Sequence, residues 1–270
     1  MPELPEVQTV VSGLSQTIVD KTIKSCYFSG QAFRGREMVI DPHKLASSTI
    51  ISCHRRAKYI LMGLSNGYIL ILHLGMSGKI LIGADARKHD HLILTFKDGT
   101  ILRFNDPRRF GVVKLIKAGD LGKEPLLKDL GLEPLEPEFS ADALRIICKD
   151  STAPIKSLIM NANLIVGVGN IYASEALFDA GVLPTRKSYT LGYEEISRLY
   201  ASIVRVLNLA IESGGSTLRD YVHLSGDVGY FQHQFKVYGK QNEVCAHCDS
   251  SVQRIIMSGR STYFCIKCQR

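Results

Sequence analysis

The first element predicted by the sequence is a helix near the N-terminus. Apolar side chains stand at Leu4, Val7, Val10, Val11 and Leu14, a spacing that places them on one face of an α-helix. A proline-containing start suits the first helical turn, where a missing N–H leaves no hydrogen bond unmade. The pattern predicts an amphipathic helix over about residues 5–14.

A different pattern begins at about Lys21 and continues to about Lys117. Short apolar runs alternate there with Asn-Gly, Asp-Gly and Ser-Gly pairs, which favour tight turns between strands. The strands predicted from these runs cover residues 68–73, 79–82, 92–96, 100–104 and 112–116. This spacing indicates a mostly antiparallel β-sandwich or barrel rather than alternating strands and helices.

The second half of the chain is predicted to be helical. Residues 124–139 contain Pro125, Pro134 and Pro137 among acidic residues, which indicates a connection between domains. The helices predicted after it cover residues 140–149, 154–162, 170–180 and 194–212. We therefore expect an α+β chain with a domain over 1–130, a linker over 131–139, a helical domain over 140–234, and a final region of strands and turns over 235–270.

The charge of the chain favours a polyanionic partner. Its 270 residues include 33 Lys and Arg against 26 Asp and Glu, a formal net charge of +7. An excess of this size is typical of nucleic-acid-binding proteins. A basic enzyme without a nucleic-acid partner and a protein that binds an anionic membrane surface are the alternatives.

The N-terminal sequence predicts a cytoplasmic protein that does not cross a membrane. No apolar run approaches the roughly 20 residues that a membrane-spanning helix needs. The acidic, twice-proline start Met1-Pro2-Glu3-Leu4-Pro5-Glu6 lacks the basic and apolar parts of a secretory signal.

Four of the seven cysteines form two pairs close to the C-terminus. Cys245 and Cys248 are followed, after sixteen residues, by Cys265 and Cys268. Two such pairs are typical of a closed site of four thiolates around one structural zinc ion, and redox thiols or an iron-sulfur cluster are the alternatives. The segment between the pairs is predicted to be a hairpin turning at residues 258–260, with Arg260 exposed to solvent or to a nucleic-acid groove.

The N-terminal dipeptide after Met1 offers a covalent catalyst. Removal of Met1 would leave Pro2 as a secondary amine with a reference pKa near 8, and such an amine forms iminium ions with electrophilic carbon. Glu3 and Glu6 share a helix face beside it and can exchange protons. The plainer interpretation is that these prolines and glutamates only build a good helix start.

Six motifs together resemble the formamidopyrimidine-DNA glycosylase family over essentially the whole chain. They occur in the family's order, and they are Pro2-Glu-Leu-Pro-Glu-Val7, Arg55-Arg-Ala-Lys-Tyr59, His73-Leu-Gly-Met-Ser-Gly78, Asp106-Pro-Arg-Arg-Phe-Gly111, Gly167-Val-Gly-Asn-Ile-Tyr-Ala173 and the four-cysteine finger. The resemblance implies an N-terminal antiparallel β-sandwich with flanking helices, a helix-two-turn-helix domain and a C-terminal zinc finger hairpin.

The resemblance implies a monomeric base-excision repair enzyme that acts on double-stranded DNA containing an oxidised purine or an abasic site. Such an enzyme releases 8-oxoguanine or formamidopyrimidines and then cleaves the strand by β,δ-elimination. The implied catalytic residues are Pro2 as nucleophile, Glu3 as acid and base, Glu6 on the same catalytic face, and Lys58 and Arg260 at the phosphates. The plainer interpretation of Lys58 is a solvated lysine at the end of a strand. In a bacterium the expected location is the cytoplasm, at the nucleoid.

An enzyme of this kind extrudes a nucleotide from the duplex, and side chains must fill the gap. The resemblance assigns that role to Met76, Arg108 and Phe110, with Arg108 also facing the orphaned base. A Met at the centre of a Gly-rich turn does not suit a core position. Phe110, in contrast, could instead be a core residue.

The resemblance also assigns residues to DNA-backbone contacts and to lesion recognition. His89, Lys156, Asn170 and Arg260 are expected at phosphates, and the plainer alternatives are a solvated imidazole for His89 and an N-cap for Asn170. Thr217 and Tyr221 are expected to read the everted base, with ordinary loop packing as the alternative. The assigned DNA-binding residues are therefore His89, Arg108, Lys156, Asn170 and Arg260.

Two departures from the family pattern and two rival functions remain. Gln8 stands where relatives often carry Glu, and Asn161-Ala162 replaces a frequent acidic-amide pair. One rival is the endonuclease VIII-like branch, which acts on oxidised pyrimidines and usually carries Gly where this chain has Leu4. The other is a zinc-ribbon DNA-binding protein without catalysis, which would leave Pro2 and Glu3 without a role.

Overall fold

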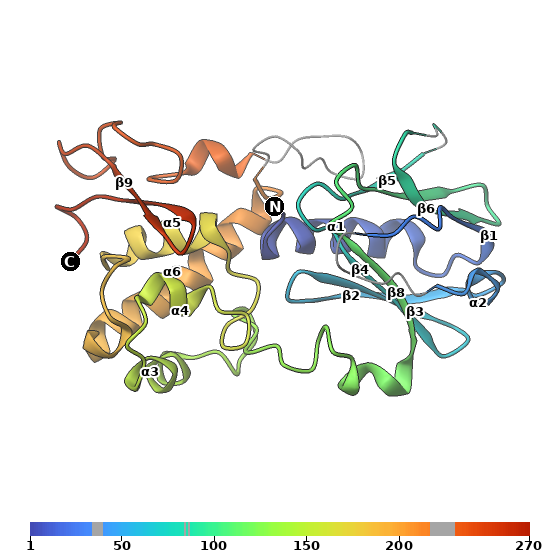
Figure 1. Ribbon diagram of the computed structural model, residues 1–270, viewed down its shortest axis with the longest axis horizontal. Helices are drawn as coiled ribbons and strands as arrows, with labels where there is room; N and C mark the ends of the chain where they lie inside the picture. The colour runs from blue at the N-terminus through green and yellow to red at the C-terminus, as the bar shows by residue number, and fades with distance from the viewer. Residues whose placement is uncertain (34–39, 84, 86, 217–229) are drawn as a thin grey trace. The chain divides into compact units, whose positions relative to one another are not determined.

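The computed structural model describes residues 1–33, 40–83, 85, 87–216 and 230–270 (Figure 1). It divides into two compact units, one of Met1–Lys128 with Ser213–Gln232 and one of Asp129–Glu212 with His233–Arg270. Within the described residues, no helix combines the length and apolar character that crossing a membrane requires.

The first unit is built on two four-stranded antiparallel sheets. One has the strand order β1 (Ile23–Phe28), β6 (Asp90–Phe96), β7 (Ile101–Asn105), β5 (Lys79–Ile82), and the other has β2 (Ile50–Arg56), β3 (Tyr59–Leu64), β4 (Tyr68–His73), β8 (Val112–Lys117). This confirms the predicted antiparallel sandwich.

The helix α1 (Leu4–Ile18) completes the core of this unit (Figure 1). Its apolar face, with Val7, Leu14 and Ile18 fully buried, joins a cluster that includes Phe96 of one sheet and Met62 of the other. The helix runs four residues beyond the predicted end because Ile18 continues the same apolar face. Two short helices, α2 (Pro42–Leu45) and the 3-10 helix Ala118–Lys123, flank the sheets.

The second unit is helical with a two-stranded hairpin. Its helices are α3 (Ala141–Lys149), α4 (Ile155–Ile159), α5 (Asn170–Ala180) and α6 (Tyr193–Glu212), with a 3-10 turn at Ser188–Thr190. Another 3-10 turn, Phe231–Gln234, spans the point where the chain passes from the first unit back to the second. The four helices match the predicted ones, except that α4 ends three residues early.

The helix α5 is central to the second unit because nine of its eleven residues are buried. Its buried residues include the polar Ser174 and Glu175, and Gly181 closes the helix in a left-handed conformation. The hairpin of β9 (Gln253–Met257) and β10 (Arg260–Phe264) packs against it. Ser258 and Gly259, both with positive φ, make the predicted tight turn between these strands.

Candidate functional site

The N-terminal residues that are predicted to act as a covalent catalyst form the buried start of a helix. Pro2 is buried, and the side chains of Glu3 and Glu6 belong to residues only 3% and 2% exposed. The Glu3 amide donates a hydrogen bond to Glu6 Oε2 at 2.8 Å, which closes the first turn of α1. The structure therefore engages both carboxylates in a capping box directly after the residue that would become the N-terminus.

The second oxygen of Glu6 holds a distant segment of the same unit. Glu6 Oε1 accepts hydrogen bonds from the Ser216 amide at 2.8 Å and from the Ser216 hydroxyl at 2.9 Å. Gly215, with a φ of 78°, passes so close that an added Cβ would lie 3.1 Å from Glu6 Oε1. Glu6 is thus a brace between the start of α1 and residues 213–216.

Lys58 lies in the two-residue turn between β2 and β3 and is half-buried. Arg55 fixes this turn, since its Nη1 donates to the Ala57 carbonyl at 3.0 Å and its Nε donates to Gln8 Oε1 at 2.9 Å. Because Gln8 lies in the second turn of α1, these bonds tie the Lys58 turn to the helix whose start carries Pro2 and Glu3.

The turn that carries Met76 connects the two sheets, between β4 and β5. Met76 is 39% exposed, so it is not a core residue. The turn begins with a hydrogen bond from the Gly75 amide to His73 Nδ1 at 3.0 Å and closes with one from the Gly78 amide to the Leu74 carbonyl at 2.7 Å. A bulky side chain is therefore displayed on a short, well-defined loop.

A second loop, residues 106–111, presents Arg108 and Phe110. The Arg108 guanidinium carbon lies 5.1 Å from the centre of the Phe110 ring, a cation–π distance. Arg108 is exposed. Phe110 is half-buried, so it is neither a full core residue nor fully exposed to solvent. His89 is exposed on the neighbouring loop and has a φ of 75°, an uncommon conformation outside glycine.

Beneath these loops, His91 is a buried neutral imidazole. Its Nε2 donates to the Asp106 carbonyl at 3.1 Å, which leaves Nδ1 to accept from the Ser29 hydroxyl at 3.0 Å. Burial lowers the pKa of His91, although the hydrogen bond to Asp106 and the charge of Asp106 oppose the shift.

In the second unit, the Lys156 side chain is buried and fully engaged. The residue is 2% exposed, and its Nζ donates to Asn170 Oδ1 at 2.7 Å, to Thr262 Oγ1 at 2.7 Å and to the Ser261 carbonyl at 3.3 Å. Three acceptors match the three donors of an ammonium group. Lys156 therefore ties α4 and α5 to the hairpin that carries Arg260.

Asn170 begins α5 but does not cap it. The N-cap is Gly169, so the alternative that Asn170 serves as the N-cap is wrong. Its amide instead accepts from Lys156 and donates to the Ser261 carbonyl at 2.9 Å.

A cavity of about 400 Å³ opens beside this cluster, within the second unit. Its polar lining includes Lys156, Ser157, Asn161, Asn170, Ser258 and Arg260. Lysine, arginine and amide side chains beside the N-terminus of a helix form a setting that favours an anion such as a phosphate. Arg260 is exposed at the hairpin turn, where it can reach a ligand.

Glu175 fixes the segment that leads from this region into the cysteine-rich end. Its carboxylate accepts hydrogen bonds from the amides of Lys236, Val237 and Tyr238 at 2.8–3.0 Å. Burial raises the pKa of Glu175, although these three donors oppose the shift.

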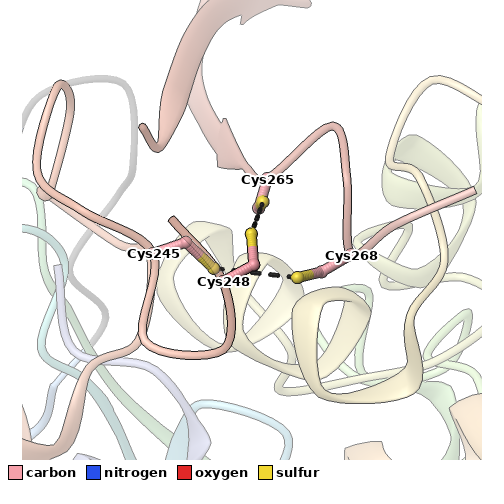
Figure 2. Close-up of side chains that lie close together, drawn as sticks. All are labelled: Cys245, Cys248, Cys265 and Cys268. Atoms are coloured by element: carbon pink, nitrogen blue, oxygen red, sulfur yellow. Dashed lines mark hydrogen bonds between the residues drawn. The ribbon is translucent and has the colours of Figure 1, made fainter. Parts of the chain in front are cut away.

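The four C-terminal cysteines converge on one point, with their sulfur atoms facing one another (Figure 2). The sulfurs all lie within 4.8 Å of one another, with Cys245 and Cys268 3.8 Å apart and Cys248 and Cys265 3.6 Å apart. A tetrahedral zinc site with Zn–S bonds of about 2.3 Å has sulfurs about 3.8 Å apart. The cluster therefore fits one structural zinc ion, held by Cys245, Cys248, Cys265 and Cys268.

The predicted recognition residues Thr217 and Tyr221 lie outside the described residues. Sequence reasoning gave no role to several residues that the structure makes prominent, above all Asp106, Arg55, Ser216 and Thr262. Arg55 and Asp106 stand at the start of two of the quoted motifs, but the motifs do not reveal their bonds to Gln8 and Ser77. The partners of Ser216 and Thr262, Glu6 and Lys156, are also distant in the sequence.

Three family models match the chain in succession. They are the formamidopyrimidine-DNA glycosylase N-terminal domain over residues 1–113, the formamidopyrimidine-DNA glycosylase H2TH domain over 130–222, and the zinc finger found in FPG and IleRS over 242–270.

Full-length relatives carry the same name. The formamidopyrimidine-DNA glycosylases of Ruegeria pomeroyi and Thioalkalivibrio sulfidiphilus are 41% and 43% identical to the chain, each over 100% of both proteins. The crystal structure of the MutM (FPG) protein from Thermus thermophilus matches with a TM-score of 0.89 and 37% identity, over 99% of this chain and 98% of that one. A complex between the Lactococcus lactis Fpg and an abasic site containing DNA matches with a TM-score of 0.90 and 34% identity, over 99% of each chain.

Proposed function

The chain belongs to the formamidopyrimidine-DNA glycosylase family, and on this premise we propose that it is a monomeric, bifunctional DNA glycosylase and abasic-site lyase. Its substrate is duplex DNA with an oxidised purine such as 8-oxoguanine or a formamidopyrimidine. Full-length similarity to named glycosylases supports this, as do solved relatives bound to DNA with a Fapy-dG lesion or an abasic site. The observation that carries the proposal is the buried Pro2-Glu3-Glu6 helix start.

The first step forms a bond between protein and sugar. After Met1 is removed, the Pro2 nitrogen attacks C1′ of the damaged nucleotide and gives up its own N–H proton. The base leaves with the electrons of its glycosidic bond and takes up a proton. The sugar ring then opens as Glu3 gives a proton to the ring oxygen, which leaves an iminium ion between Pro2 and C1′. The position of Pro2 directly before α1, next to Glu3, supports this step.

The second step cuts the strand. The iminium ion withdraws electrons, so a proton leaves C2′ and the 3′ phosphate departs in a β-elimination. A second elimination then releases the 5′ phosphate. Lys58 and Arg260 are the cations proposed to bind these phosphates and stabilise them as they leave. The hydrogen bonds of Arg55 support this role for Lys58, since they tie its turn to α1.

Glu6 and Lys156 have supporting roles in this proposal. Both oxygens of Glu6 accept hydrogen bonds, one from Glu3 and one from Ser216, so Glu6 holds the catalytic helix start in place. The ammonium of Lys156 binds three protein acceptors and so positions Asn170 and the Arg260 hairpin beside the cavity of the second unit. Arg260 and Asn170 then meet DNA phosphates, as His89 and Arg108 do from the first unit.

The proposal also assigns a gap-filling role to Met76, Arg108 and Phe110. Everting a nucleotide leaves a hole in the base stack, and the exposed Met76 and the paired Arg108 and Phe110 offer an apolar wedge and hydrogen-bond donors to the orphaned base. Thr217 and Tyr221 remain the proposed readers of the everted base.

The proposal is tested with duplexes that carry 8-oxoguanine or an oxidised pyrimidine. The wild-type protein should release the purine lesion, nick the strand and form a covalent adduct that borohydride traps. Pro2→Gly should lose at least about a hundredfold in base release, and Glu3→Gln should lose a similar factor. Preference for the pyrimidine would favour the endonuclease VIII-like function, and binding without any cleavage would favour a non-catalytic zinc-ribbon protein.

A further inference from the structure

Asp106 is a fully buried carboxylate to which neither the sequence motifs nor the proposed chemistry gives a role. It follows β7 directly and is 0% exposed. Its Oδ1 accepts a hydrogen bond from the Ser77 hydroxyl at 2.7 Å, and its Oδ2 accepts one from the Gly111 amide at 2.8 Å. Burying a carboxylate costs free energy unless such bonds are made, so these two contacts fix its position.

The backbone of Asp106 makes three further contacts. Its amide donates to the His89 carbonyl at 3.1 Å, and its carbonyl accepts from the Arg109 amide at 3.2 Å and from His91 Nε2 at 3.1 Å. One residue therefore binds three separate segments, the turn 74–78, the segment 87–91 and the loop 106–111. Each of these segments carries a side chain assigned to DNA.

The turn and the loop also touch directly through their backbones. Gly75 has a φ of 60°, and a Cβ added to it would lie 2.5 Å from the carbonyl carbon of Phe110. A Cβ on Gly111 would lie 2.7 Å from the His73 carbonyl oxygen and 2.6 Å from the Phe104 ring. No side chain fits between the two segments, so a shift of one displaces the other.

Ser77 connects the same two segments a second time. While its hydroxyl donates to Asp106, its oxygen also accepts from the Arg108 amide at 3.3 Å. The residue after Met76 is thus bonded to the residue that carries the guanidinium beside Phe110. The turn 74–78, Asp106 and the loop 107–111 form one hydrogen-bonded body.

We propose that Asp106 is a positioning residue for nucleotide eversion. It locks the Met76 turn to the Arg108 and Phe110 loop, so the three side chains enter the base stack as one preformed wedge. This inference rests on the proposed function, since it requires a nucleotide to leave the stack. Loops whose backbones are already fixed lose less conformational freedom when the gap opens, which favours the everted state.

Two substrates separate positioning from general folding. A lesion duplex requires eversion and gap filling, whereas a single-stranded abasic oligonucleotide has no stack to refill. The test compares base excision on the duplex with borohydride trapping on the single strand. Ser77→Ala removes the hydrogen bonds of its hydroxyl with Asp106 and with the Arg108 amide, and Asp106→Ala removes the carboxylate bonds with Ser77 and with the Gly111 amide. Ser48→Ala is the matched control, because Ser48 is also buried in the first unit and its hydroxyl donates to the Lys44 carbonyl at 3.0 Å, away from these loops.

The expected result is a loss of activity that is confined to the duplex substrate. Ser77→Ala should slow duplex excision about fivefold and Asp106→Ala more than about tenfold, while trapping on the single strand changes less than about twofold. Ser48→Ala should match the wild-type protein on both substrates. Equal losses on both substrates, or a wild-type duplex rate in Asp106→Ala, would overturn the inference. If Asp106→Ala does not fold, the Ser77→Ala comparison decides alone.

A measurement without DNA separates this inference from the proposed function. Amide hydrogen exchange in the peptides that cover 74–78 and 106–111 should accelerate together in Ser77→Ala, while the peptide of α6 stays unchanged. Unchanged hydrogen exchange in the two loops would contradict the proposed link between them, regardless of the excision rates. If the wild-type protein forms no borohydride-trapped adduct with either substrate, the proposed function is wrong. The exchange measurement then tests the link between the two loops on its own.

Discussion

Gln8 is a single residue whose chemistry sets how firmly the Lys58 turn is held. The carboxamide oxygen of Gln8 accepts the hydrogen bond from Arg55 Nε at 2.9 Å, in a partly buried position. A glutamate at this position would pair its charge with the guanidinium. A neutral acceptor makes a weaker bond to an arginine than a carboxylate does.

The first prediction concerns this bond. Gln8→Glu should raise the free energy of unfolding by about 1 kcal/mol, because it converts a neutral bond to a charge-assisted one. Gln8→Ala should lower it by a similar amount. Thermal unfolding of the three proteins checks this, and a midpoint for Gln8→Glu at or below that of the wild-type protein would contradict it.

The second prediction concerns His91 and pH. Because burial lowers its pKa in the folded state, the unfolded chain takes up a proton first as the pH falls below about 6.5. The stability that the neutral imidazole contributes is therefore present above that pH and is lost as the pH falls toward the folded pKa. The midpoint of thermal unfolding, measured in buffers from pH 7.5 down to pH 5, should show this decline. His91→Gln should show a smaller decline, and an equal one would contradict the assignment.

The sequence identified chemical groups better than it identified their partners. Lys156 was predicted at a phosphate, yet its ammonium is buried against Asn170, Thr262 and Ser261. Thr262 lies 106 residues further along the chain, and no local pattern encodes contacts over such separations. The same reason hid Asp106, whose carboxylate meets Ser77 29 positions earlier.

At the scale of elements, turn signals and apolar periodicity located most helices and strands. β4 and β5 have the predicted bounds, and α5 runs over the predicted residues 170–180. The strands β1, β2 and β3 were not picked out individually. Polar residues interrupt β1 and β2, whose exposed positions need no apolar side chain. Pairing with neighbouring strands, which a local pattern does not record, stabilises them.

The third prediction tests the contact between the Met76 turn and the neighbouring loop. Gly75→Ala should lower the free energy of unfolding by about 3 kcal/mol, because the new methyl meets the Phe110 backbone in a left-handed conformation. Gly67→Ala is the control, since Gly67 also has a positive φ but nothing within 4 Å of an added Cβ. It should cost only about 1 kcal/mol.

Urea denaturation of both variants measures the difference. Equal losses of stability in Gly75→Ala and Gly67→Ala would mean that the turn and the loop are not in backbone contact. A larger loss in Gly75→Ala would agree with the packing that places both segments beside Asp106.

The fourth prediction concerns the zinc ion at the cysteine cluster. The purified protein should contain one zinc per chain, and a strong chelator should remove it and unfold the β9–β10 hairpin, because such sites supply their modules with folding free energy. DNA affinity should fall with the metal, since the hairpin carries Arg260. Metal analysis with hydrogen exchange of residues 245–268 checks this. Undiminished DNA binding by demonstrably zinc-free protein would contradict it.

At the scale of the whole molecule, charge and motifs answer different questions. The net charge of +7 favours a polyanionic partner but does not identify one. The order of motifs along the chain, supported by family models over all three segments, identifies the family. Composition alone favoured a plain helix start at Pro2, because a nucleophilic amine and a capping proline look the same in a sequence. The capping box that Glu3 and Glu6 form is compatible with both interpretations, so a chemical test at Pro2 is needed to distinguish them.

The central claim is that the nitrogen of Pro2 bonds to the sugar of the damaged nucleotide. The most direct measurement is peptide mapping by mass spectrometry of the adduct trapped by borohydride on a duplex containing 8-oxoguanine. The account predicts one modified peptide, which lacks Met1 and carries the sugar remnant on Pro2. An adduct on Lys58 or another lysine, or an active enzyme that retains Met1, would contradict it.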